Sequence, residues 1–469
     1  MTATRLERDD LGEIALPTEA LWGIHTARAV ANFPLALRPV HPALIHAYGE
    51  VKQACCAVNR ELGYLDQPHA DALASACREL AAGVLDAHIL VDALQGGAGT
   101  STNMNVNEVL ANRACQIAGR ALGDHAWCDP LAHVNLHQST NDTYPTALRV
   151  AALRLLKGLE SAIVAAQEAA QALERRFAGI VKVGRTECQD AVLTTLGRHF
   201  GALADVLARD RWRVAKCEER LRVVNLGGTA IGTGCGAPRQ FIFRAVDRLR
   251  ADTGLALARA ENLIDATQNQ DALVEVSGIL KALAVTLLKA TTDLRWLSSG
   301  PDAGLGELRL PAMQAGSSIM PGKVNPVIPE AVAQAAMQVI ANDSCLTMAL
   351  SHGSLELHPF LPLVADRLLD SLDLLTRACR ILATRCLAGI EADASRCAAQ
   401  VANATASATA LVPLVGYHRS AEIAAAARAT GTTIRAAALA HGVAEADFDA
   451  AVTPEAVTRL GDPTRPQPA

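Results

Sequence analysis

The sequence predicts a mostly α protein built around a bundle of long helices. The chain is 50% hydrophobic but only 3% aromatic, and its alanine and leucine content favours closely packed helices over sheets. Apolar residues over 364–386 recur at steps of three and four, which is the spacing of one face of a packed helix. Segment 272–297 is apolar on nearly all sides, as expected for a helix buried in a large core or between subunits. These patterns predict a bundle that oligomerises.

The chain of 469 residues is long enough for two or three domains. Residues 1–137 mix turns, short helices and polar loops, and we expect them to form an N-terminal domain. Residues 138–395 are expected to form the long central bundle, and residues 396–469 a small C-terminal helical domain. Within the central region, further helical runs are predicted at 145–176, 190–222 and 330–350.

Charge and cysteine usage limit the possible partners. A net charge of -5 argues against nucleic acid as the main partner. The 12 cysteines are scattered without a C-x-x-C pair, which is typical of reduced thiols. No signal-peptide pattern opens the sequence and no apolar run reaches the length of a membrane span, so we expect a cytoplasmic protein.

The most informative stretch is the loop 316–326, Gly-Ser-Ser-Ile-Met-Pro-Gly-Lys-Val-Asn-Pro. Its glycines permit backbone angles that other residues avoid, while its prolines fix theirs. Between these positions lie two hydroxyls, one cation and one amide, from Ser317, Ser318, Lys323 and Asn325. Such a loop suits an active site that closes over an anion.

Three further clusters of polar residues lie at 95–108, 137–142 and 184–190. The first follows three glycines with hydroxyls and amides, so that backbone N–H groups and side chains can meet a carboxylate. The second supplies donors without charge, and capping of the following helix is an alternative explanation for both. The third mixes a hydroxyl, a carboxylate and an amide. The candidate binding residues of the three clusters are Thr100, Ser101, Ser139, Thr140, Asn141, Thr186 and Glu187.

Two other patterns are assigned no chemistry. The Gly/Thr loop 227–234 lacks the Gly-Lys-Ser/Thr ending of a P-loop, and we interpret it as structural. His133 and His137 are four residues apart, but no third ligand is evident, so no metal site is expected. We expect the chemistry to need no metal and no organic cofactor.

In this order along the chain, the clusters resemble the active-site regions of the aspartase/fumarase superfamily, which catalyses reversible anti-elimination to a fumarate-like product. Loop 316–326 resembles the signature loop of that family, and the similarity extends from 21–28 to 413–417. Three segments resemble aspartate ammonia-lyase more than fumarase: 24–26, 95–101 and 327–330.

The resemblance implies release of ammonia or an amine from aspartate or an N-substituted aspartate, giving fumarate. Ser317 would be the general base, while Lys323 and Asn325 would hold the carboxylate that becomes an enediolate. The remaining roles would be charge binding by Thr100, Ser139 and Thr140, proximity to the leaving amine for Asn141 and Thr186, and a catalytic carboxylate at Glu330. The resemblance also implies a homotetramer in which three chains build each active site. Fumarase-type hydration and a non-catalytic structural paralogue are the alternatives.

One departure from the family pattern is prominent. Glu187 stands where matching family members carry histidine or glutamine, and the resemblance places this position opposite Glu330. Two carboxylates about 4 Å apart repel by about 4 kcal/mol at an effective dielectric of 20, so one would be protonated or a cation would lie between them. The other departures are Thr292, Asp302, His358 and Val412. They indicate either the same chemistry on a modified substrate or drift among tolerated residues.

Overall fold

The computed structural model describes residues 3–461 and is mostly helical, which confirms the predicted fold class. Two compact units can be distinguished. Unit 1 contains the residues up to Glu160, Trp212–Ala284 and Met337–Thr376, and unit 2 contains Ser161–Arg211, Val285–Ala336 and the residues from Arg377 onward. The three-domain boundaries after residues 137 and 395 remain a prediction.

The longest helices confirm most of the predicted helical runs. They are α5 (Thr140–Arg176), α6 (Leu196–Leu221), α9 (Asp271–Leu297), α10 (Val327–Leu350) and α11 (Leu361–Arg385). The predicted apolar face of α11 is buried from Val364 to Cys386, so its spacing of three and four reflects real packing. On α9 the apolar residues Val285 and Trp296 remain more than half exposed in the single chain.

The prediction of helix over 190–222 was wrong at its beginning. Residues Gln189–Thr195 form strand β4, which pairs with β3 (Val181–Thr186) in an antiparallel hairpin. The strand is rich in β-branched residues, which suit a pleated strand better than a helix. Helix α6 begins only after this hairpin.

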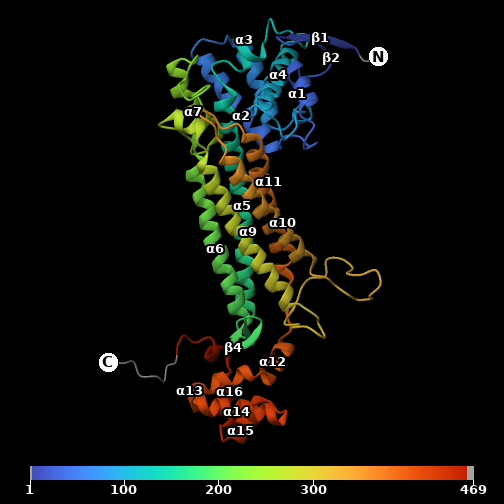
Figure 1. Ribbon diagram of the computed structural model, residues 1–469, viewed down its shortest axis with the longest axis vertical. Helices are drawn as coiled ribbons and strands as arrows, with labels where there is room; N and C mark the ends of the chain where they lie inside the picture. The colour runs from blue at the N-terminus through green and yellow to red at the C-terminus, as the bar shows by residue number, and fades with distance from the viewer. Residues whose placement is uncertain (1–2, 462–469) are drawn as a thin grey trace, which may run out of the picture. The chain divides into compact units, whose positions relative to one another are not determined.

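In unit 1 several helices lie side by side (Figure 1). They are α1 (Ile24–Asn32), α2 (Pro42–Glu61), α3 (Gln67–Ala81), α4 (Thr100–Ile117) and α7 (Arg239–Thr253). A side chain at Gly49 of α2 would approach the Ala81 nitrogen to 2.5 Å, so glycine permits close contact between α2 and α3. The smaller elements of this unit are β1 (Thr4–Asp9), β2 (Gly12–Pro17), η1 (Asp86–His88), η2 (Pro130–Val134), β5 (Val223–Val224), β6 (Ala258–Arg259) and α8 (Leu263–Gln268).

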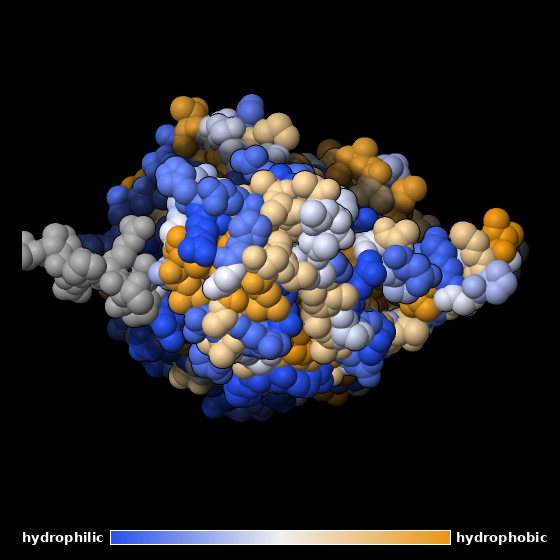
Figure 2. Space-filling view, turned by 90° about the horizontal axis from the view of Figure 1, so that it is seen from below, coloured by the Kyte–Doolittle hydropathy of each residue, from blue (hydrophilic) through white to orange (hydrophobic). Residues whose placement is uncertain are grey.

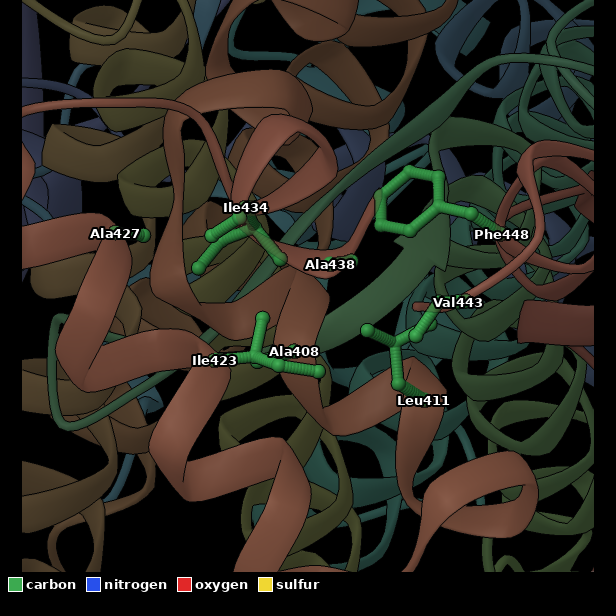
Figure 3. Close-up of a cluster of buried hydrophobic side chains, with 9 residues drawn as sticks. Ala408, Leu411, Ile423, Ala427, Ile434, Ala438, Val443 and Phe448 are labelled. Carbon is green, nitrogen blue, oxygen red and sulfur yellow. The ribbon is translucent and has the colours of Figure 1, made fainter. Parts of the chain in front are cut away.

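Unit 2 ends in a set of short helices with its own hydrophobic core. Leu411, Ile423, Ile434, Val443 and Phe448 converge in this core (Figure 3). Seen from below, the molecular surface mixes hydrophilic residues with smaller hydrophobic patches (Figure 2). The short elements are β7 (Leu308–Arg309), η3 (Leu387–Gly389), β8 (Glu391–Ala392), α12 (Ala394–Asn403), η4 (Thr405–Leu411), α13 (Val412–Val415), α14 (Tyr417–Thr430), α15 (Ile434–Ala440), α16 (Glu445–Ala451) and α17 (Pro454–Val457).

No single helix within residues 3–461 has the length and apolarity of a membrane span. The bent pair formed by Ala394–Asn403 and Thr405–Val415 has sufficient length and apolar composition. In unit 2, however, Ala406, Ala408 and Leu411 of this pair are buried in packed cores. Core packing therefore accounts for these apolar residues.

Candidate active site

The N-terminus of α4 presents the first predicted cluster. The chain enters this helix through a tight turn in which Ala98 has φ 56° and Gly99 has φ 95°. A side chain at Gly99 would overlap the Tyr144 ring, with an approach of 2.1 Å, so only glycine fits there. Thr100 is exposed and Ser101 half-buried in the first turn of α4, where the helix dipole favours an anion. The N–H groups of Thr100 and Thr102 already donate, to the Gly97 carbonyl and to Gln95 Oε1.

The N-terminus of α5 presents the second cluster. Ser139 immediately precedes the helix, and its Oγ accepts from the backbone N–H of Asn141 (3.2 Å). Thr140 is the first residue of the helix, and its Oγ1 accepts from Asn103 Nδ2 of α4 (3.1 Å). The structure therefore brings the first two predicted clusters together in unit 1 as neighbouring helix N-termini rich in hydroxyls.

Asp142 ties the N-terminus of α5 to the Gly/Thr loop. Its carboxylate is fully buried and accepts from the backbone N–H groups of Ser139 (3.0 Å), Gly227 (3.1 Å) and Thr229 (3.0 Å). Burial raises the pKa of Asp142 to about 6 in spite of these three donors. Thr229 is held at φ 55°, which is rare for a β-branched residue, and such strain concentrates at functional sites.

The same loop orients Asn141. Its Nδ2 donates to the carbonyl oxygen of Ala230 (2.7 Å), which can only accept, so the position of the amide nitrogen is fixed. Asn141 Oδ1 has no partner among residues 3–461 and is available as an acceptor. Loop 227–234, which we interpreted from the sequence as structural, thus determines how the side-chain amide of a candidate substrate-binding residue is oriented.

Pro145 lies inside α5, whereas the sequence predicted a helical run that begins only at this residue. Proline has no N–H to offer the carbonyl four residues earlier, which is that of Asn141. The side chain of Asn225 donates to this carbonyl instead (3.0 Å) and also to Thr267 Oγ1. A side chain thus replaces the missing helix hydrogen bond at the site.

A buried lysine is connected by hydrogen bonds to the N-termini of α4 and α5. Lys52 is 1% exposed, and its Nζ donates to Asn135 Oδ1 (2.9 Å). Burial lowers the pKa of Lys52 to about 8. Asn103 and Asn107 of α4 donate to the same oxygen, at 3.2 and 3.3 Å. These residues form a continuous buried polar network that reaches Thr140.

The third predicted cluster lies in unit 2, at the exposed turn of the β3–β4 hairpin. Glu187 and Cys188 connect the strands with φ of 54° and 63°. A two-residue turn of this kind prefers Asn-Gly, because both central residues need a left-handed conformation. Glu187 therefore lies on a strained turn, and Thr186 directly precedes it at the end of β3. Backbone strain of this kind is typical of functional positions.

A buried carboxylate anchors this hairpin. Glu307 is fully buried and pairs with Lys182 Nζ (2.8 Å) and Arg185 Nη1 (2.6 Å), both on β3. Arg185 also donates to Gln400 of α12 (3.3 Å). Two cations thus compensate one buried charge and fix the strand that leads to Thr186.

Loop 316–326 folds back on itself in unit 2. The backbone N–H of Gly316 donates to the carbonyl of Lys323 (2.9 Å), and Asn325 Nδ2 donates to the carbonyl of Gly316 (2.7 Å). A side chain at Gly316 would lie 2.3 Å from the Lys323 carbonyl oxygen, so glycine is required at this closure. The loop stands away from the helices (Figure 1).

The chemical groups of the loop are accessible. Ser317 Oγ accepts from the backbone N–H groups of Ile319 (3.2 Å) and Met320 (3.0 Å), which favours negative charge on this oxygen. Ser318 and Lys323 are exposed, and Lys323 forms no ion pair with any described residue. Ile319 is 83% exposed, an unusual position for a large apolar side chain.

Glu330 lies in the first turn of α10 and lines a cleft of about 440 Å³ in unit 2. Thr292, one of the departures from the family pattern, lines the same cleft. The other lining residues are Arg295, Trp296, Ser299 and Pro326. His358 differs from these positions because it is buried in unit 1, where its Nε2 meets the Leu350 carbonyl (3.2 Å).

The predicted site residues therefore form two groups, one in each unit. Unit 1 holds Thr100, Ser101, Ser139, Thr140 and Asn141, and unit 2 holds Thr186, Glu187, Ser317, Ser318, Lys323, Asn325 and Glu330. Sequence reasoning missed the residues that orient the first group, namely Lys52, Asn103, Asn135 and Asp142. Asn103 and Asp142 were inside the quoted polar clusters, whereas nothing in the sequence marked Lys52.

Among residues 3–461, no group of three or more histidine, cysteine, aspartate or glutamate side chains could hold a metal ion. His133 stacks on His69 at 5.2 Å between ring centroids, whereas His137 Nδ1 bonds Asn59 Oδ1 (2.7 Å). The two histidines thus have separate partners. The twelve cysteines of the described chain are all free thiols.

The sequence is similar to known enzymes over most of its length. The lyase family model matches residues 12–341, and the model of the fumarase C C-terminus matches residues 408–459. The chain is 47% identical over 438 residues to aspartate ammonia-lyase of Pseudomonas aeruginosa, covering 92% of each chain. It is 41% identical over 454 residues to class II fumarate hydratase of Thermosynechococcus vestitus, covering 96% of each.

A solved structure shows the same fold. The crystal structure of "fumarate lyase:delta crystallin" from Brucella melitensis, bound to cobalt, superposes with a TM-score of 0.92 at 46% identity. The match covers 96% of this chain and 98% of the other. The matched family is enzymatic, and the similarity extends over nearly the whole chain. This chain is therefore a lyase that belongs to the aspartase/fumarase superfamily.

Proposed function

We propose that this enzyme releases ammonia or an amine from aspartate or an N-substituted aspartate and gives fumarate. The observation that carries the choice of leaving group is the orientation of Asn141. Its Nδ2 donates to the Ala230 carbonyl, which orients the amide and leaves Oδ1 as an acceptor for the substrate. A substrate ammonium can donate to this oxygen in a charge-assisted hydrogen bond, which is stronger than a bond from the neutral hydroxyl of malate.

The substrate carboxylates are proposed to bind where donors gather. In unit 1 the hydroxyls of Thr100, Ser101, Ser139 and Thr140 lie at the N-termini of α4 and α5. In unit 2, Lys323 contributes a cation that forms no ion pair with residues 3–461, and Asn325 and Ser318 lie on the same loop. The proton beside a carboxylate is very weakly acidic, so the enediolate needs such dense, preorganised donors.

Ser317 is proposed as the general base. It would take the proton from the carbon next to one carboxylate, the electron pair would form the double bond, and the carbon–nitrogen bond would break on the opposite side. A serine base requires a stabilised oxyanion, and the two N–H donors at Ser317 Oγ support this role. Thr186 and Glu187 on the strained hairpin turn are proposed to contact the leaving amine, with Glu330 as a neighbouring carboxylate.

The complete site is proposed to form in a homotetramer, with three chains contributing to each site. The two groups of site residues belong to different units, and each unit exposes large apolar side chains on its long helices. These are Val285 and Trp296 of α9 in unit 2, and Met337 and Met348 of α10 in unit 1. Exposed apolar helix faces of this kind mark contacts with other chains. The enzyme is further proposed to be cytoplasmic and to need no cofactor.

Fumarase-type hydration is the second candidate, favoured by the 41% identity to a class II fumarate hydratase. The experiment that separates the two candidates is amination of fumarate by the wild type and by Asn141→Ala. If Asn141 binds the amine, the variant should raise the KM for ammonium about 10- to 100-fold and leave competitive inhibition by succinate unchanged. An unchanged KM for ammonium, or equal loss of succinate binding, would contradict this role.

A further inference from the structure

Lys52 determines which atoms donate and which accept in the hydrogen bonds that lead to Thr140. A lysine ammonium only donates, so the atom of Asn135 at 2.9 Å from Lys52 Nζ must be the amide oxygen. The other end of the same amide agrees, because Asn135 Nδ2 donates to the Gln138 carbonyl (3.2 Å). The orientation of Asn135 is thus determined at both ends.

The orientation of Asn135 determines that of Asn103. An amide oxygen of Asn103 would repel Asn135 Oδ1 at this distance, so Asn103 Nδ2 lies there, 3.2 Å away, and donates. The second hydrogen of Asn103 Nδ2 goes to Thr140 Oγ1 (3.1 Å). Asn103 Oδ1 lies 3.4 Å from the Thr143 hydroxyl, which donates at a shorter distance to the Ser139 carbonyl (2.8 Å). Asn103 is 2% exposed and has no freedom to rotate its amide without losing these contacts.

Thr140 is consequently an acceptor toward Asn103. Its own hydroxyl hydrogen must point elsewhere, and no described residue accepts it. Thr140 is the first residue of α5, so this hydrogen is available at a helix N-terminus, where anions bind favourably. A threonine hydroxyl without such a constraint can rotate and present its lone pairs to a carboxylate instead.

We propose that Asn103 is a positioning residue that holds the Thr140 hydroxyl as a donor to a substrate carboxylate, with its amide orientation set by Lys52 through Asn135. This inference rests on the proposed function, because it assumes that a dicarboxylate binds at the N-terminus of α5. It adds to that function a reason why the Thr140 hydroxyl is oriented before the substrate binds. The network beneath the site decides in advance which way a neutral hydroxyl faces, so that no reorientation is needed when the anion arrives.

The test reverses the polarity without changing the size of the side chain. In Asn103→Asp the carboxylate can only accept, so the Thr140 hydroxyl would donate to it and present its lone pairs to the substrate. Succinate binding to the full-length protein is measured by isothermal titration calorimetry. The dissociation constant should rise about 10- to 100-fold, as it should in Thr140→Val. In Asn103→Ala the hydroxyl is free to rotate, and a smaller rise of several-fold is expected.

A double-mutant cycle separates this role from a general structural one. If Asn103 acts through the Thr140 hydroxyl, Asn103→Asp combined with Thr140→Val binds succinate as Thr140→Val does. A new buried charge that merely repels succinate would weaken the double variant further. Asn105→Asp is the matched control, because Asn105 lies on the same helix but bonds Leu90 and His88 instead. It should bind succinate as the wild type does.

The outcomes distinguish this inference from the proposed function. Wild-type affinity in Asn103→Asp, or a double variant much weaker than Thr140→Val, would overturn the positioning role. If Asn103→Asp does not fold, Asn103→Ala decides, and unchanged affinity there would also overturn it. Fumarate release from aspartate is measured in parallel. Succinate binding without lyase activity would overturn only the proposed function, whereas a wild type that binds no dicarboxylate would overturn both.

Discussion

Asp142 makes a prediction about stability whose sign and size follow from its surroundings. Its carboxylate is fully buried, and burial raises its pKa from 3.8 to about 6. This difference corresponds to about 3 kcal/mol of free energy that favours the protonated form in the folded state. Below pH 4 the group is protonated in both states, so this stabilising contribution is fully present. It is lost as pH rises through about 6, and the free energy of unfolding falls accordingly.

Asp142→Asn removes this titration while it keeps the size of the side chain. The free energy of unfolding of the variant, relative to the wild type, should therefore increase by about 3 kcal/mol between pH 4 and pH 6 and stay constant above. The assay is urea unfolding followed by circular dichroism, at one protein concentration and several pH values. Parallel stability curves of the two proteins over this range would refute the reasoning.

Asp142→Asn should also be less active than the wild type, even at the pH values at which its stability relative to the wild type has increased. Its amide places an NH2 group opposite at least one of the N–H donors of Ser139, Gly227 and Thr229. A buried donor without an acceptor costs about 1–3 kcal/mol, and relief of this conflict would displace Ser139 or the loop that orients Asn141. The two measurements together test one idea. If Asp142→Asn gains stability over the wild type between pH 4 and pH 6 and also has a lower kcat/KM for aspartate, the buried carboxylate serves function at a cost in stability.

Four further predictions concern the proposed function. Ser317→Ala should lose several orders of magnitude in kcat with unchanged assembly, and near-normal turnover would remove Ser317 from the mechanism. Light scattering at low micromolar concentration should give about four times the chain mass, and a stable, active monomer would refute the shared sites. Exhaustive chelation should leave activity in place, whereas complete loss restored by one divalent ion would show a metal requirement. Glu187→Gln should change the order of kcat/KM among aspartate, amine-substituted aspartates and malate, because Glu187 is proposed to favour cationic groups. An unchanged order would exclude that role.

The sequence predicted those features that depend on local pattern. The spacing of apolar residues over 364–386 identified α11 and its buried face, because apolar residues of an amphipathic helix recur with the helical period of about 3.6 residues. Loop 316–326 was evident because its glycines and prolines are local signals. The β3–β4 hairpin was missed, because its turn contains Glu187 and Cys188 and lacks the Asn-Gly that marks such turns.

The supporting residues of the candidate site could not be predicted in the same way. Lys52 acts on Thr140 through Asn135 and Asn103, which come from separate segments of the chain. A lysine in the middle of a helix otherwise indicates an exposed position. Likewise, the Ala230 carbonyl orients Asn141 through a contact between residues 89 apart in the sequence. Such contacts depend on tertiary packing, which no local pattern records.

The most direct test of the central claim is the release of fumarate from L-aspartate and from L-malate by the purified protein, followed by the ultraviolet absorbance of fumarate. The orientation of Asn141 and the similarity to aspartate ammonia-lyases predict a higher kcat/KM for aspartate or an N-substituted aspartate than for malate. A kcat/KM that is highest for malate would contradict the assignment as a carbon–nitrogen lyase.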